Sequence, residues 1–200
     1  MPELPRPFPL SEKSKLATGT EKTVYVDGTD KVVKVYRGSH RDRKAAVSLE
    51  KAYDKVKWRR LLAQEFYLTK IVRLLFPNTI ADIHMASVSS DIAPQSVHEK
   101  VAPATDFFSR FRDMYAAFVD LQRDSDKARD IADAYGGAGV ELQFTKDNFT
   151  YDEQRRLHYI DSLGVKDIDM LQQTISQRLS GDEQKRAQAY LDRLRHHLSL

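Results

Sequence analysis

A change of pattern at Pro103 divides this chain of 200 residues into a strand-rich first half and a helix-rich second half. In the first half, β-branched and aromatic residues form runs at 23–26 and 31–36 on either side of the turn sequence DGTD. This arrangement predicts a tight hairpin. An earlier strand is predicted at residues 15–17. After Pro103, apolar residues recur at helical spacing. We therefore expect an α+β fold in two lobes, with a small antiparallel sheet in the first and a short helical second lobe.

The remaining elements are predicted from apolar periodicity and from helix-breaking residues. They are a helix over 42–76, strands near 83–88 and 96–101, helices over 107–121 and 125–135, an irregular piece over 140–148, strands at 149–151 and 157–160, and helices from there to the end. The sequence SGDE from Ser180 to Glu183 is a capping-box pattern that opens the last helix. We expect the first lobe to cover 1–101, with an N-terminal arm, the sheet, the long helix and a hinge, and the second to cover 102–200.

Composition excludes several classes of site. There is no cysteine, so disulfides, zinc–thiolate sites and thiol nucleophiles are ruled out, and the six histidines show no metal-binding spacing. No apolar run approaches the roughly 20 residues that span a bilayer, and the proline-containing N-terminus does not resemble a secretory signal. We expect no membrane association and a cytoplasmic location.

Basic residues concentrate between Arg37 and Arg60, where nine basic side chains accompany three acidic ones. One interpretation is a solvated helix face. The other is a contact surface for an acidic protein or a phosphate-bearing partner. Because the net charge of the whole chain is only +3, we do not expect nucleic acid as a partner, although a basic interaction module that binds nucleic acid or an acidic protein is retained as a third hypothesis.

The strongest local signal for chemistry is the segment DNFTYDEQRRLHYIDSL at 147–163. Asn148 precedes a short hairpin and Asp161 follows its second strand, so the hairpin brings these two residues close together. An amide oxygen and a carboxylate are hard ligands of the kind that Mg²⁺ prefers. The sequence therefore predicts a metal site at the open end of this hairpin.

The asparagine, the hairpin and the terminal aspartate resemble the catalytic loop and the DFG aspartate of protein kinases and aminoglycoside-phosphotransferase-type kinases. The spacing of thirteen residues from Asn148 to Asp161 is typical of that family. The resemblance implies that both residues bind the metal and that Asp161 is catalytic. Asp161 is followed by Ser162-Leu163 in place of Phe-Gly.

The first half follows the same family order. Alignment on Val24 leaves Gly19 as the one glycine retained from the Gly-rich loop. The run Val32-Val33-Lys34 resembles the strand that carries the ATP-binding lysine. The resemblance implies that Lys34 binds the α- and β-phosphates of ATP and pairs with a helix carboxylate, with Glu65 as first choice and Glu50 as second.

The hinge between the lobes is expected at 98–101, where the backbone of Glu99 and Val101 would bind adenine. The resemblance covers roughly residues 15–163 in order. The 39 residues after Asp161 leave no room for a full activation segment, so we expect a reduced helical second lobe.

One family residue is missing. The catalytic aspartate would lie five residues before Asn148, where this chain has Gln143, and an amide cannot accept a proton at neutral pH. Phosphoryl transfer could rest on positioning and metal electrostatics, with Glu141 or Asp147 as a displaced base. A different part of ATP could be transferred, or the protein could be a pseudokinase.

We therefore expect an ATP- and Mg²⁺-dependent kinase-like phosphotransferase of minimal size, with an unknown acceptor. The alternative is a pseudokinase that acts as a non-catalytic binding or regulatory protein. A purely structural interpretation makes Lys34 an exposed strand lysine, Asn148 a turn former and Asp161 a strand-end cap.

Overall fold

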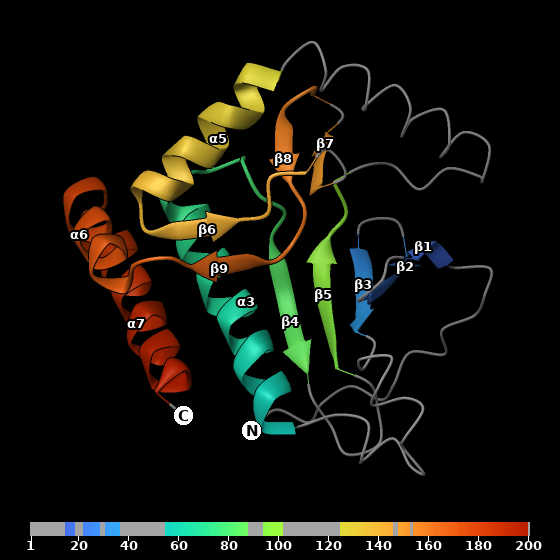
Figure 1. The fold of residues 1–200 in the computed structure, drawn as a ribbon, viewed down its shortest axis with the longest axis horizontal. Coiled ribbons are helices and arrows are strands. Elements are labelled where there is room, and N and C mark those ends of the chain that lie inside the picture. Colours follow the sequence, from blue (N-terminus) through green and yellow to red (C-terminus); the bar gives the residue numbers. More distant parts are fainter. Residues whose placement is uncertain are drawn as a thin grey trace. The chain divides into compact units, whose positions relative to one another are not determined.

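The computed structural model describes residues 15–18, 22–28, 31–36, 55–87, 94–101, 125–145, 148–152 and 154–199 (Figure 1). By its internal contacts the chain groups into two compact units. Unit one is Met1–Ala63 with Ile83–Glu99, and unit two is Gln64–Asp82 with Lys100–Leu200. The lobe boundary at residue 101 stays a prediction. The α+β class, with a small antiparallel sheet and a set of helices, is confirmed.

Unit one contains a five-stranded antiparallel sheet in the order β1-β2-β3-β5-β4. Its strands are β1 Lys15–Thr18, β2 Lys22–Asp27, β3 Lys31–Tyr36, β4 Ile83–Ser87 and β5 Gln95–Glu99. The predicted hairpin is confirmed, with Asp27 opposite Lys31 at its closed end. Gly28 follows β2 with a φ of 68°, a left-handed conformation that favours glycine.

The central strand β3 pairs with β2 on one side and with β5 on the other. Val33 is fully buried and Tyr36 nearly so. The Tyr36 ring lies 5.2 Å from the ring of Trp58, measured between centroids. Trp58 comes from the first turns of helix α3, Lys55–Leu75. The aromatic contact thus packs the start of this helix against the sheet of unit one.

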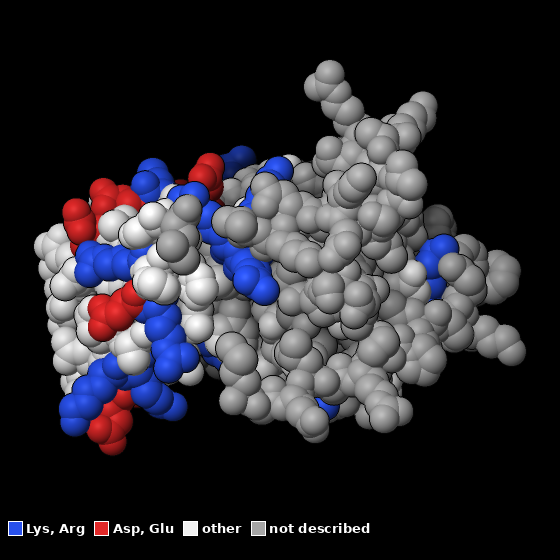
Figure 2. Space-filling model, turned by 90° about the horizontal axis from the view of Figure 1, so that it is seen from below, with Lys and Arg blue, Asp and Glu red and all other residues white. Residues whose placement is uncertain are grey.

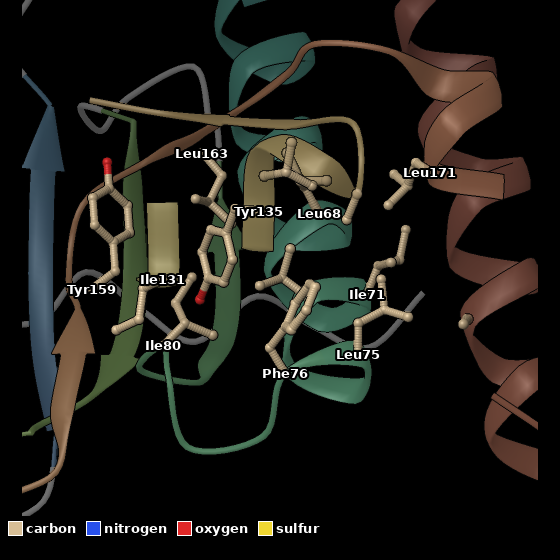
Figure 3. Packing of buried hydrophobic residues seen from close by; sticks show 14 of the residues in the cluster. Leu68, Ile71, Leu75, Phe76, Ile80, Ile131, Tyr135, Tyr159, Leu163 and Leu171 are labelled. Carbon is tan, nitrogen blue, oxygen red and sulfur yellow. The ribbon is translucent and has the colours of Figure 1, made fainter. Parts of the chain in front are cut away.

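In the part of unit two that the structure describes, four helices contribute to one hydrophobic core. They are the part of α3 from Gln64 onward, α5 Ser125–Gly137, α6 Ile168–Arg178 and α7 Gly181–Leu198. Figure 3 shows Leu68, Ile71 and Leu75 from α3 facing Leu171 from α6 within this cluster. The C-terminal helix adds Ala187, Leu191 and Leu194, all fully buried. These residues recur at helical spacing and form the buried face of α7.

Helices α6 and α7 pack together within unit two (Figure 1). Arg195 near the end of α7 donates to Gln172 at 2.7 Å and to Asp169 at 3.2 Å, both on α6. The capping box predicted at the start of α7 is wrong in part. Ser180 is the N-cap residue, but its side chain makes no capping hydrogen bond. Gly181, the next residue, has a φ of 57°, so the first turn departs from ordinary helix geometry.

The described residues of unit two also form two small two-stranded sheets. One pairs β7 Phe149–Tyr151 with β8 Leu157–Tyr159, which confirms the predicted hairpin. The other pairs β6 Val140–Leu142 with β9 Leu163–Val165. The predictions of an irregular piece over 140–148 and of helix after the hairpin are wrong where these two strands lie. Strands of three residues are too short to show an alternation of apolar and polar residues. The partners in the β6–β9 pair are also more than twenty residues apart in the sequence.

Several other predictions have clear outcomes. The helix predicted over 125–135 and the strands predicted near 83–88 and 96–101 are confirmed within two residues at their ends. The predicted helix over 42–76 is confirmed from Lys55 to Leu75, and its earlier part lies outside the described residues. The helix predicted over 107–121 lies entirely outside them.

Candidate functional site

The hairpin of β7 and β8 is closed by a network around Asp152. The Asp152 carboxylate accepts hydrogen bonds from the Arg156 backbone N–H at 2.8 Å, from Arg156 Nε at 2.7 Å and from His158 Nε2 at 2.9 Å. Partial burial acts to raise the pKa of this carboxyl group, but these donors outweigh it and lower the pKa to about 2. The turn thus has a fixed anionic centre, which holds the two short strands in register.

Asn148 precedes β7 and is held by both its side chain and its backbone. Its Nδ2 donates to the Gln143 carbonyl at 2.9 Å, and its own carbonyl accepts from the Ile160 N–H at 2.8 Å. Because a carbonyl can only accept, the NH₂ of the amide must face Gln143. The amide oxygen is therefore on the opposite side of the group. An oxygen fixed in this way can bind a cation.

Asp161 follows β8, one residue after Ile160, and is half-buried. The backbone bond between Ile160 and Asn148 and the pairing of Phe149 with Tyr159 bring the two ends of the hairpin together, as predicted. A carboxylate and an amide oxygen suit Mg²⁺, which commonly binds one or two protein oxygens together with phosphate oxygens. The described residues contain no group of three or more His, Cys, Asp or Glu side chains that could hold a metal ion.

Glu65 belongs to unit two and lies on α3 with 4% of its surface exposed. Its Oε1 atom accepts a hydrogen bond from the Ser162 hydroxyl at 3.4 Å, and Ser162 directly follows Asp161. A buried carboxylate needs hydrogen bonds or a cation to stay ionised. Within unit two, Glu65 is therefore connected to the turn that carries the candidate metal ligand.

Lys34 belongs to unit one and lies in the middle of β3, opposite Val24 on β2 and Ser96 on β5. Only 5% of its surface is exposed, so the interpretation of an exposed strand lysine is wrong. A buried ammonium group requires polar or anionic partners. The pairing of Lys34 with Glu65 stays a prediction.

The other expected nucleotide contacts fall at the end of β5. Glu99 is the last residue of this strand, opposite Lys31, and Val101 follows two residues later. The use of these backbones for adenine binding stays a prediction. Gly19 and Glu50 lie outside the described residues.

Gln143 occupies the position of the missing aspartate, at the end of β6. Its side chain is exposed, and its carbonyl accepts from both Asn148 Nδ2 and the Thr145 N–H. Of the two displaced bases considered, Asp147 lies outside the described residues. Glu141 lines a hollow of about 600 Å³ with Arg129 and Lys166, and Asn148 and Asp161 are not among the described residues that line it.

Two residues of this region, Tyr159 and Ser162, are not predicted as site residues from the sequence. The fully buried Tyr159 hydroxyl accepts from the Gln143 N–H at 3.2 Å and donates to the Ser162 carbonyl at 3.0 Å. Burial raises the pKa of Tyr159 to about 12, with a further contribution from Glu65, although the Gln143 hydrogen bond acts in the other direction. A tyrosine within an apolar strand gives no sequence signal for such a role.

The basic segment predicted at 37–60 is described only from Lys55 onward. Lys57, Arg59 and Arg60 are exposed there. Figure 2 shows basic and acidic side chains intermixed over the described part of the face it draws. The predicted acidic or phosphate-bearing partner stays a prediction. Among the described helices, none is both long enough and apolar enough to cross a membrane, and the cytoplasmic location stays a prediction.

Comparison with known proteins finds distant similarity to solved structures alone. No protein-family model matches the chain, and no curated protein matches it. Among solved structures, the chain is similar to WbdD, a bifunctional kinase-methyltransferase, with 12% identity and a TM-score of 0.41 over 92% of this chain and 45% of that one. It is also similar to a GDP complex of a mutant aminoglycoside 2'-phosphotransferase-IIIa, with 13% identity and a TM-score of 0.39 over 92% of this chain and 78% of that one. This chain therefore spans less than half the length of the WbdD chains that it matches.

Proposed function

We propose that this protein binds ATP with Mg²⁺ and is a phosphotransferase. In this proposal Asn148 and Asp161 bind the metal, Lys34 binds the phosphates, and Glu65 keeps Lys34 charged and in place. Bound Mg²⁺ would supply neutralisation of phosphate charge. The backbones of Glu99 and Val101, together with Gly19, would contact the nucleotide.

The observation that carries the proposal is the fixed orientation of the Asn148 amide. Its nitrogen donates to the Gln143 carbonyl, so its oxygen faces away from that bond. The adjacent Ile160–Asn148 backbone bond brings the segment that contains Asp161 to the same end of the hairpin. We infer that an asparagine which only formed a turn would not need its amide oxygen directed away from the loop in this way.

Gln143 favours a second candidate function, a pseudokinase that binds nucleotide without transferring phosphate. The glutamine side chain is exposed, and an amide cannot take a proton from an acceptor hydroxyl at neutral pH. The two candidates share the nucleotide site and differ in turnover. The acceptor of a transfer reaction is not specified by either.

The test is the thermal unfolding midpoint of the protein with ATP, with and without Mg²⁺. A ligand at 100 times its Kd stabilises the folded state by about 2.7 kcal/mol, which is readily measured. We expect an increase that requires Mg²⁺ and is lost in Asp161→Ala, while the control Asp182→Ala, at an exposed position on α7, keeps it. Equal binding of Mg²⁺ and ATP by wild type and Asp161→Ala would show that the site assignment is wrong.

ATP turnover then separates the two candidates. Hydrolysis or transfer above the background of Asp161→Ala would support the phosphotransferase. Mg²⁺-dependent binding without any turnover would support the pseudokinase, since Gln143 leaves the site without a base at the family position. If turnover is found, a Gln143→Asp variant is expected to increase it, because a carboxylate can accept the proton that an amide cannot.

A further inference from the structure

We propose that Tyr159 is a positioning residue, whose hydroxyl ties the Gln143–Asn148 loop to the Asp161–Ser162 turn and so fixes the two metal-binding side chains relative to each other. The inference rests on the metal and nucleotide site proposed above. It concerns a side chain that would contact neither the metal nor the nucleotide.

The geometry of the Tyr159 hydroxyl is specific to these two segments. It accepts from the Gln143 N–H at 3.2 Å and donates to the Ser162 carbonyl at 3.0 Å. Both protein groups are backbone atoms, so the link acts on the path of the chain itself. A change of side chain at 143 or 162 would leave it in place.

Each end of this link leads directly to one candidate ligand. On one side, the Gln143 carbonyl accepts from Asn148 Nδ2 and therefore orients the amide oxygen. On the other side, Ser162 is the residue after Asp161, and its hydroxyl donates to Glu65. The chain of contacts thus runs from Glu65 through Ser162 and Tyr159 to Asn148, entirely within unit two.

Packing alone does not account for a tyrosine at this position. The ring lies 5.4 Å from the Phe149 ring, at one edge of the cluster drawn in Figure 3, with its hydroxyl pointing away from the apolar side chains. A phenylalanine could make the same ring contacts. Burying a hydroxyl costs free energy unless it is hydrogen bonded. Here the Tyr159 hydroxyl donates one hydrogen bond and accepts another.

The experiment compares Tyr159→Phe with the matched control Tyr135→Phe. Tyr135 is also fully buried in the core of unit two, and its hydroxyl lies 2.8 Å from Thr79 Oγ1, so it does not join the two loops. Each variant removes one buried hydroxyl and keeps the ring. A general loss of stability should therefore appear in both variants.

The first readout is amide hydrogen exchange of the protein without ligand. We expect amide exchange at 143–145, at Asn148 and at 160–162 to be about five times faster, or more, in Tyr159→Phe, with little change there in Tyr135→Phe. Equal exchange of these segments in the two variants would overturn the proposal. This readout does not depend on whether the protein binds a nucleotide.

The second readout is the affinity for ATP with Mg²⁺. Residues that orient metal ligands typically change metal affinity 10- to 100-fold when altered, so we expect at least about a tenfold loss in Tyr159→Phe and less than about twofold in Tyr135→Phe. Unchanged affinity in Tyr159→Phe would overturn the positioning role even if exchange increased. Absence of binding in the wild type would overturn the proposed function instead, and the exchange data would then show separately whether Tyr159 holds the two segments together.

Discussion

Gly139 lies where the end of α5 meets the connection between β9 and α6. Its φ is 79°, a left-handed conformation, and a Cβ built on it would collide with the carbonyl oxygen of Asp167. Its own carbonyl accepts from the N–H groups of Lys166 and Asp167 at 2.9 and 3.0 Å. The backbone at this point cannot shift without breaking those two bonds. We therefore expect Gly139→Ala to destabilise unit two.

The magnitude follows from two contributions. A non-glycine residue in the left-handed region costs about 1–2 kcal/mol. Relief of the collision with Asp167 requires the loss or weakening of two hydrogen bonds, at about 1 kcal/mol each. Together these give a decrease of about 3 kcal/mol in the free energy of unfolding. The control is Gly137→Ala, at the last residue of α5, where a Cβ meets no atom within 4 Å, so we expect no loss and a gain of up to about 0.5 kcal/mol.

The assay is urea unfolding followed by circular dichroism at 222 nm, which reports on the helices of unit two. With a slope of about 2 kcal/mol per molar urea, the midpoint of Gly139→Ala should fall by roughly 1.5 M relative to wild type. Agreement of the two alanine variants within about 0.3 M would refute the reasoning. It would mean that the close approach to Asp167 relaxes at little cost.

Two further predictions concern pH. The pKa of the Asp152 carboxyl group is lowered from 3.8 to about 2. This group therefore contributes stability that is fully present above about pH 4 and is lost as the pH falls towards 2. In urea unfolding, Asp152→Asn should remove this part of the acid sensitivity, and the control Asp182→Asn should keep it. Burial, with a smaller contribution from His196, lowers the pKa of His197, whose ring stacks on Tyr67. The neutral ring is therefore favoured in the folded state, and stability is lost as the pH falls below the unfolded pKa of about 6.5. His197→Gln should show a smaller decrease between pH 7 and 5.5, and a decrease equal to that of the wild type would contradict the assignment.

The elements predicted correctly are those whose signals are local. The β2–β3 hairpin has a glycine turn between two β-branched runs, and α3, α5 and α7 have apolar residues at helical spacing over at least three turns. The pair β6 and β9 was missed because three residues carry too little pattern and because the pairing is made by residues distant in sequence. Gly164, opposite Glu141 in this pair, further weakens the strand signal.

The candidate site likewise contains residues that could be predicted from the sequence and one that could not. Asn148 and Asp161 could be identified from the sequence because their residue types suit a metal and because a predictable hairpin joins them. The burial of Lys34 could be expected from the apolar residues beside it on a central strand. The bridge made by Tyr159 could not be predicted, since it depends on the direction of one hydroxyl and on two backbone groups placed by the missed strands.

The order in which the core residues of unit two occur along the chain has a consequence for synthesis on the ribosome. Its core combines Leu68, Ile71 and Leu75 with Leu191 and Leu194 from α7, so the apolar stripe of α3 is made about 120 residues before its last partners. At roughly 5–20 residues per second this interval is on the order of 6–24 s. The strands β4 and β5 of unit one are synthesised during that time, after α3 and before its partners from α7. We therefore expect a nascent chain of this protein to lack the last partners of α3 for several seconds, which would make its yield in a cell sensitive to chaperones and to the rate of translation.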